Sequence, residues 1–293
     1  ITDYGWEAEL AIPFKTMGFD KENKEWGIKF IRHMVNKLES GYWPVANLNA
    51  DRFQVSDAGI LEGIEDITQG IGLDISPYLV TGFNTQKGEK LDPKLTAGVD
   101  LFYQITPSLK SSLTINTDFA ETEVDDRQIN LTRFSLHYPE KRDFFLDGAN
   151  YFQFGLEGDR ESPVSNKLIP FFSRRMGLDE DGNPIPINVG AKLTGQVENW
   201  NVGMMYINDA RDEGINNFSV ARVTRNLGEQ SSVGIIGTHG NALSGDQNTV
   251  VGADIILATS SFQDNRNVSF FLFGLKSNTK EIKGDDASWG VQA

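Results

Sequence analysis

The sequence predicts an all-β protein: an antiparallel up-and-down transmembrane β-barrel, incomplete in this chain, preceded by the last strands of a β-sandwich. From residue 73 onward, apolar and polar residues alternate in runs close to the ~9–11 residues that a tilted strand needs to cross a bilayer. Short turns separate some runs and long loops separate others, which is the asymmetry of a transmembrane barrel. No stretch reaches the ~18 consecutive apolar residues that mark a transmembrane helix.

The composition limits the partners and the chemistry. A net charge of −14 argues against nucleic acid, because phosphates need a basic face. The chain has no cysteine, which excludes disulfides, thiolate metal sites and thiol catalysis. His33, His137 and His239 lie far apart in the sequence and lack the spacing of zinc ligands. We therefore expect no nucleic-acid partner, no metal and no cofactor.

Residues 1–50 differ from the rest and predict the C-terminal part of a β-sandwich. An alternating run at 6–13 is ended by a proline and predicts one strand, and the run at 26–35 predicts a second. The region holds Trp6, Trp26 and Trp43, which are candidates for stacking on the faces of sugar rings. The alternative, which we favour, puts Trp6 and Trp26 in the sandwich core and Trp43 against the following linker.

Residues 51–72 predict a linker that packs as it runs, because glycines recur there at short intervals among isoleucines. Residues 73–293 then form the barrel. We expect about eleven strands, at 73–85, 95–105, 108–119, 128–138, 168–175, 187–197, 199–209, 217–226, 231–240, 248–259 and 266–277. An open, odd set of strands would leave unpaired edges in lipid. Since the chain starts and stops within alternating runs, we expect it to be a fragment cut at both ends.

The stretch 118–155 is the least ordinary part of the chain. Acidic residues open it, a strand-like run carrying arginines follows, and five aromatic rings close it after a proline turn. Burying so many unpaired ions in a dry core would be costly, and exposing so many aromatic rings on a solvated loop would be unfavourable too. We expect a segment that fills or lines a polar lumen. Its charged network is Asp118, Glu121, Glu123, Arg127, Arg133, Glu140, Lys141 and Arg142.

Other roles for this network remain open. Asp118, Glu121 and Glu123 could supply a general acid–base pair, because glycoside hydrolysis needs two carboxylates, or they could bind Ca²⁺. The basic group around Arg142 could hold an anionic substrate rather than pair with the acids upstream. We favour structural pairing for both sets, because an unpaired cluster in a lumen would repel itself. The sequence contains no nucleophile-elbow motif and no recognisable Ser/His/Asp set, so we assign no catalytic residue.

Residues 114–155 carry a resemblance to a known family. The pattern TxNxDFAExExDxxQxNLTRFxLxxPEKRxFFLxGAxxFxFG resembles the barrel region of a Bacteroidetes-type outer-membrane family of unknown function, DUF5916-like. In that family a carbohydrate-binding family 9-like domain precedes a C-terminal β-barrel. The resemblance implies that residues 1–50 are the end of such a sugar-binding domain. It also implies a Gram-negative outer membrane, with lipid as a partner and glycan as a candidate ligand.

Two functions follow as hypotheses. The first is an outer-membrane β-barrel that binds or handles carbohydrate without catalysis. The alternative is a soluble or surface-attached carbohydrate-active enzyme of the glycoside hydrolase type, carrying the same kind of sugar-binding module. The dyad alternation of the strands and the resemblance at 114–155 favour the first.

Overall fold

The structure is a computed structural model in two compact units. It describes residues 5–14, 17, 19–20, 23–44, 58–67, 70–84, 92–117, 140–155, 169–179, 185–211, 216–242, 244–263, 266–280, 282–284 and 286–293. Unit 1 is Ile1–Gly72 with Gln104–Ser108, and unit 2 is Leu73–Tyr103 with Leu109–Ala293. The fold is all-β with one large antiparallel sheet, as the alternation predicts.

Unit 1 contains two small antiparallel sheets. β1 (Trp26–Ile28) pairs with β4 (Gly59–Leu61), and β2 (Phe30–Met34) pairs with β3 (Glu39–Trp43). The single strand expected at 26–35 is therefore two strands, because its two halves take different partners. β4 lies within the expected linker.

The strand expected at 6–13 is absent. These residues form no ladder and are exposed to solvent. The alternating pattern was present, but a strand also needs a neighbouring backbone to accept and donate its hydrogen bonds.

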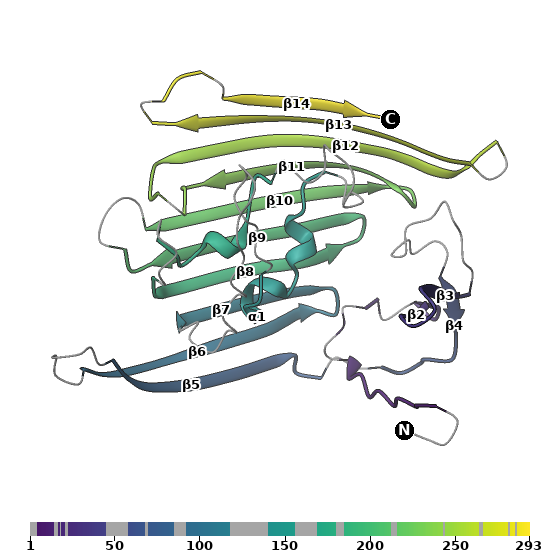
Figure 1. Cartoon of the computed structure of the whole chain (residues 1–293), viewed down its shortest axis with the longest axis horizontal. Helices are drawn as coiled ribbons and strands as arrows, with labels where there is room; N and C mark the ends of the chain where they lie inside the picture. Colours follow the sequence, from purple (N-terminus) through teal and green to yellow (C-terminus); the bar gives the residue numbers. More distant parts are fainter. Residues whose placement is uncertain are drawn as a thin grey trace. The chain divides into compact units, whose positions relative to one another are not determined.

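Unit 2 is a ten-stranded meander in which every strand pairs with its neighbours in the chain (Figure 1). Its strands are β5 (Leu73–Asn84), β6 (Asp92–Thr106), β7 (Leu109–Thr117), β8 (Ile187–Val197), β9 (Trp200–Asp209), β10 (Asn217–Leu227), β11 (Ser231–His239), β12 (Asn248–Phe262), β13 (Arg266–Thr279) and β14 (Ala287–Gln292). Among the described residues the sheet is open, with β5 and β14 at its edges.

Two of the expected strands are not found among the described residues. The one expected at 168–175 is wrong: residues 169–172 are irregular and η4 (Ser173–Arg175) is a 3₁₀ turn. Pro170 has no N–H to donate to a ladder, and the amides of Arg175 and Met176 bond locally to the carbonyls of Phe172 and Ser173. The strand expected at 128–138 lies outside the described residues.

The two faces of the large sheet differ in an unusual way. We call the inner face the one that carries Thr114, Lys192, Thr194, Arg222 and Asp254, all of them buried despite being polar. The outer face carries the alternate residues of the same strands, and it is apolar and exposed. Its exposed residues include Leu79, Leu95, Met204, Ile235, Val251, Leu257, Leu272 and Val291. The outer face is thus apolar although it is exposed, whereas the inner face buries polar side chains beside the residues of the hydrophobic core.

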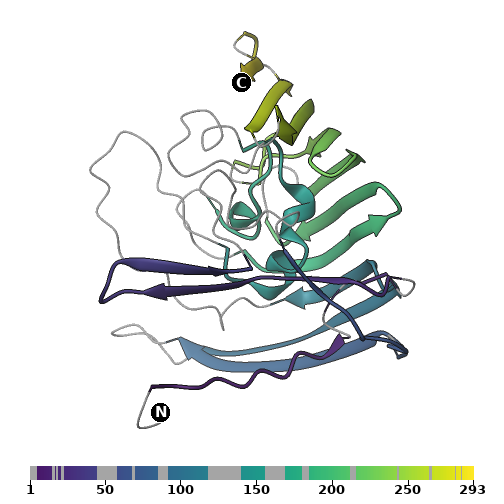
Figure 2. The same cartoon turned by 90° about the vertical axis from the view of Figure 1, so that its right-hand side faces the viewer.

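Short helical segments cover the inner face. They are α1 (Asp143–Leu146), η3 (Ala149–Phe152) and η4, and the sheet of unit 2 curves around the side on which they lie (Figure 2). We call residues 140–155 together with 169–179 the plug segment. The hydrophobic core of unit 2 lies between the plug segment and the middle strands.

Candidate functional site

The plug segment is anchored to the sheet by aromatic side chains. Phe144, Phe145 and Phe152 are buried, and they share one core cluster with Ile207 and Phe218 of the sheet. The aromatic series was expected to wall a polar pore. Phe144, Phe145 and Phe152 lie in the hydrophobic core instead, and Phe154 packs against it.

Glycines on the inner face let the plug segment approach the strands closely. A Cβ on Gly203 of β9 would lie 2.8 Å from the carbonyl oxygen of Tyr151, well inside contact distance. A Cβ on Gly190 of β8 would lie 2.6 Å from Thr114 and 3.2 Å from the ring of Phe144. Larger residues at either position would push the plug segment off the sheet.

Arg142 and Glu140 form a buried ion pair inside the plug segment. Arg142 Nε donates to Glu140 Oε1 at 2.7 Å and Nη2 donates to Oε2 at 2.7 Å. The remaining guanidinium donors reach the carbonyls of Met176 and Ser173, at 2.6 and 2.7 Å. Burial acts to raise the pKa of Glu140, but the hydrogen bond and charge of Arg142 prevail, and the pKa lies below its usual 4.5. The pair thereby joins the 140–155 part of the plug segment to the 169–179 part.

Lys192 of β8 joins the sheet to the α1 turn. Its side chain is fully buried, and its ammonium donates to the carbonyls of Phe144 and Asp147. The carboxylate of Asp147 lies 3.8 Å from Lys192 and 2.9 Å from Lys110. Burial, and after it the charge of Asp147, raises the pKa of the Tyr151 phenol above 10.0, so the phenol stays neutral at physiological pH.

Arg222 of β10 and Asp254 of β12 form the second link between sheet and plug segment. Their side chains pair through two hydrogen bonds of 2.7 and 2.8 Å, and both are almost fully buried. Arg222 Nε also donates to the carbonyl of Gln153 at 3.1 Å, and Asp254 Oδ2 accepts from the amide of Gly155 at 2.9 Å. We call these four residues the Arg222–Asp254 lock. The lock holds the end of the 140–155 segment through its backbone, and the ring of Phe154 lies 5.2 Å from the guanidinium of Arg222.

A third buried ion pair lies near the end of β9. Arg211 Nη2 and Asp209 Oδ2 are 2.7 Å apart, and Arg211 also donates to the carbonyl of Ala242 at 2.7 Å. The guanidinium lies 4.7 Å from the ring centroid of Phe218. This pair ties the 241–242 chain to the sheet beside the core.

The structure brings together only part of the expected lumen network. Glu140 and Arg142 pair as described, and Lys141 beside them is partly buried. Asp118, Glu121, Glu123, Arg127 and Arg133 lie outside the described residues, so the pairing expected of them stays a prediction.

Sequence reasoning did not single out Lys192, Arg222, Asp254 or Asp209 as functional residues. For Lys192, Arg222 and Asp254 the signal was present, because each is a charged residue inside a strand, on the face opposite its apolar neighbours. The sequence did not reveal what these side chains bind. The backbone carbonyls that accept from Lys192 are 45 or more residues away in the sequence, and the carbonyl that accepts from Arg222 is 69 residues away.

The three tryptophans of unit 1 have different environments. Trp26 packs with Phe14 and Phe19, at ring-centroid distances of 5.7 and 6.0 Å. Trp43 packs on Phe30 at 5.7 Å and against Gly59, and Trp6 is 65% exposed, so the expected place of Trp6 in a core is wrong.

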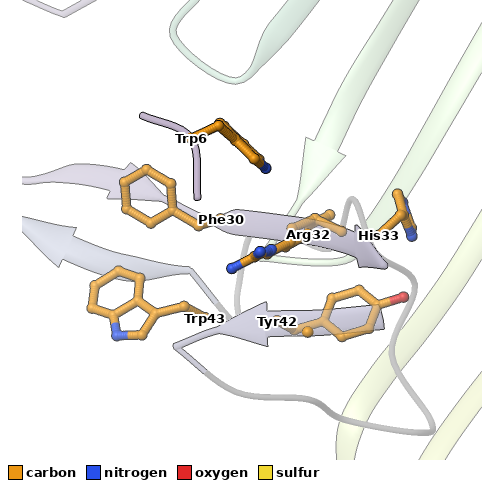
Figure 3. Close-up of a pocket in the computed structure, with 8 residues that line it drawn as sticks. Trp6, Phe30, Arg32, His33, Tyr42 and Trp43 are labelled. Atoms are coloured by element: carbon orange, nitrogen blue, oxygen red, sulfur yellow. The ribbon is translucent and has the colours of Figure 1, made fainter. Parts of the chain in front are cut away.

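Trp6 and Trp43 line an open cavity of about 500 Å³, together with Phe30, Arg32 and Tyr42 (Figure 3). Ile31, His33 and Gly41 complete the described lining. Among the described residues, no three His, Asp or Glu side chains gather as metal ligands would. The helices that the structure describes include none long and apolar enough to cross a membrane.

Comparison with known proteins connects part of the chain to a family. No curated protein and no solved structure is similar to the chain. Residues 70–184 match the model of a family described as "Domain of unknown function (DUF5916)". The matched range starts just before β5, ends just before β8 and contains both parts of the plug segment. The match supports a DUF5916-like family for this chain.

Proposed function

We propose that unit 2 is part of the wall of an outer-membrane β-barrel whose interior is filled by the plug segment. The observation that carries this proposal is the apolar, exposed outer face of a sheet whose inner face buries charged side chains. A sheet in water hides its apolar face, whereas a barrel in lipid turns that face outward and keeps polar groups inside. Val223, Ile235 and Ala253 lie side by side in register on neighbouring strands, and Ile235 is 61% exposed.

The strand lengths and the ends of the outer face support the same proposal. β8 to β13 each have at least the ~9 residues that a tilted strand needs to span a bilayer. On β9 the outward side chains run Trp200, Val202, Met204 and Tyr206, with aromatic rings at both ends. Trp200 lies 5.3 Å from the guanidinium of Arg225, and the Tyr206 hydroxyl donates to Asn217, so both rings combine an apolar body with a polar neighbour. Trp and Tyr favour such positions at a membrane surface.

The interior suits a barrel that is closed rather than open to flow. Buried charges on the inner face are satisfied by the plug backbone and by each other, which avoids the cost of leaving ions unpaired in a restricted space. A wall that binds its own plug in this way favours a gated or sealed barrel over a permanently open channel.

The test uses the absence of cysteine in the chain. Single variants Ile235→Cys and Val251→Cys carry a fluorophore in protein reconstituted into vesicles that contain brominated lipids. Both fluorophores should be quenched by the acyl-chain bromines, and Glu229→Cys in the β10–β11 turn should not be. Equal, weak quenching at all three positions would overturn the membrane assignment. Full extraction of the protein from cells without detergent would favour the alternative, a soluble carbohydrate-active enzyme.

A second function, glycan binding by unit 1, has an observation of its own. Trp6, Phe30 and Trp43 gather exposed rings around one cavity, and aromatic faces stack on the apolar faces of sugars. We propose that this cavity binds carbohydrate. Retention of the full chain on immobilised glycans tests the proposal, and Trp43→Ala should abolish the retention. Retention unchanged by that variant would overturn it.

A further inference from the structure

One side of the cavity of unit 1 is formed by the paired strands β2 and β3. Phe30 of β2 lies opposite Trp43 of β3, and Arg32 lies opposite Gly41, which has no side chain. Phe30 and Arg32 are two residues apart on one strand and therefore point to the same side. The guanidinium of Arg32 lies 5.8 Å from the ring centroid of Trp6 (Figure 3). The Arg32 cation thus lies among the aromatic rings of the cavity, and the position opposite it on β3, Gly41, has no side chain to fill the space.

Trp43 is held in place while much of its ring stays exposed. A Cβ on Gly59 would lie 2.6 Å from the Trp43 ring, so β4 meets the indole edge where only a glycine fits. The side chain is nevertheless 49% exposed. A ring that is seated along one edge and open elsewhere is pre-organised for stacking, which lowers the entropy cost of binding.

The polar groups of the cavity are mostly hydrogen-bond donors. Arg32 carries only donors, and the indoles of Trp6 and Trp43 each carry one donor and no acceptor. His33 already exchanges a hydrogen bond with Ser40 at 2.7 Å. Among the described residues that line the cavity, none is Asp, Glu, Asn or Gln. A neutral sugar presents hydroxyl groups that need both donors and acceptors, whereas a carboxylate needs donors alone.

We propose that this cavity selects a carboxylate-bearing sugar, the uronic acid residue of an acidic glycan. The carboxylate pairs with the guanidinium of Arg32 in the space above Gly41, and the sugar ring stacks on Trp43 or Trp6. The inference rests on glycan binding by unit 1 and adds its specificity. The net charge of −14 repels an anionic ligand at long range, so binding of a carboxylate depends on a local cation, which Arg32 supplies here.

The experiment titrates the full chain in detergent with an oligogalacturonate and with a neutral galactose oligomer of equal length, followed by calorimetry. The wild type should bind the acidic oligomer roughly tenfold or more tightly, which is the range of one charge-assisted pair. Arg32→Gln should bring the acidic affinity down to the neutral one. Lys24→Gln is the matched control, because it removes a cation from an exposed site of unit 1 that does not line the cavity. It should leave both affinities unchanged.

The outcomes separate this inference from glycan binding itself. Equal affinity of the wild type for both oligomers overturns the acidic specificity and leaves glycan binding standing. Binding of neither oligomer overturns both. An acidic preference that survives Arg32→Gln, in a variant with unchanged melting temperature, overturns the role of Arg32. If Arg32→Gln misfolds, Arg32→Met removes the charge while keeping an unbranched side chain of similar length, and an acidic preference that is fully retained there would also contradict the proposed pairing.

Discussion

At the scale of single residues, buried charges on the inner face hold a backbone rather than a partner side chain alone. Arg222 satisfies Asp254 and the carbonyl of Gln153 together, and Lys192 satisfies two carbonyls of the α1 turn. Burying ions is costly unless every donor and acceptor is matched. The plug segment therefore cannot move off the sheet without leaving charges unpaired, which makes its position specific.

Gly234 offers a test of how tightly the lock is built. A Cβ at this position on β11 would lie 2.7 Å from Arg222 Nη1, so Gly234→Ala should displace the guanidinium and weaken its pairing with Asp254. We expect a loss of about 1–3 kcal/mol in unfolding free energy, with faster amide exchange at Gly155. Gly237→Ala is the control on the same strand, because a Cβ there would meet only a backbone oxygen at 4.0 Å. Equal effects of the two variants would contradict the close packing described for Arg222.

Glu140 predicts a pH dependence of the plug segment. Its folded pKa lies below the ordinary 4.5, because Arg142 stabilises the carboxylate more than burial destabilises it. A carboxylate with a lowered folded pKa contributes stability that is present above the unfolded pKa and is lost as pH falls through the folded pKa. The urea midpoint should therefore fall as the pH drops below about 4.5, and it should fall less in Glu140→Gln. Parallel pH profiles for the two proteins would show that this carboxylate does not supply the effect.

At the scale of elements, strand positions in unit 2 followed from a period of two. The strand expected at 187–197 has those same bounds, and β9 and β11 differ from expectation by one residue. Local pairing makes this possible, because most strands pair with a strand close to them in the sequence; the pairing of β7 with β8, across the plug segment, is the exception. The run at 6–13 alternated equally well and formed no ladder, since alternation does not supply a neighbour.

The sequence could not say which face of the sheet would be buried. Alternation placed Ala253 and Asp254 on opposite sides, but only the position of the plug segment decides that Asp254 is inside. The same holds for the aromatic series at 144–154, whose rings needed the opposite wall before a dry core could be told from a lined pore. Contacts between residues far apart in the chain carry this information, and no local pattern encodes them.

The residues of β11 that lie on the outer face allow a test of whether this face is apolar because it meets lipid. Ile235 is the outward residue between Val223 and Ala253, and Ile235→Arg would put a charge among the apolar residues of the outer face. If the site lies near the bilayer midplane, the variant should lose about 2–4 kcal/mol of folding free energy in lipid vesicles. Glu229→Arg in the β10–β11 turn should cost far less. An Ile235→Arg protein that inserts and melts like the wild type would mean that this face meets water.

At the scale of the whole of unit 2, the sheet and the plug segment form one folding unit, because they share one hydrophobic core. Phe144, Phe145 and Phe152 supply much of the only core cluster found among the described residues. Removing residues 140–155 would therefore expose Ile207, Phe218 and Ile236. Such a deletion tests folding more than gating, because each large core side chain lost costs about 3–5 kcal/mol. Loosening the plug segment while keeping its core contacts is the sharper experiment.

The double variant Arg222→Ala, Asp254→Ala removes the lock and leaves every core phenylalanine in place. Deleting both partners avoids a lone buried charge, so the protein should still assemble, with the 153–155 chain held less firmly. In planar bilayers the full-length wild type should conduct little, and the double variant should show frequent brief openings. The matched control is Lys276→Ala, Asp286→Ala, which removes an exposed pair of the same unit at 3.6 Å and should leave conductance unchanged. Identical conductance in wild type and lock variant, both migrating as folded protein on unheated gels, would remove the plug segment as the element that seals the barrel.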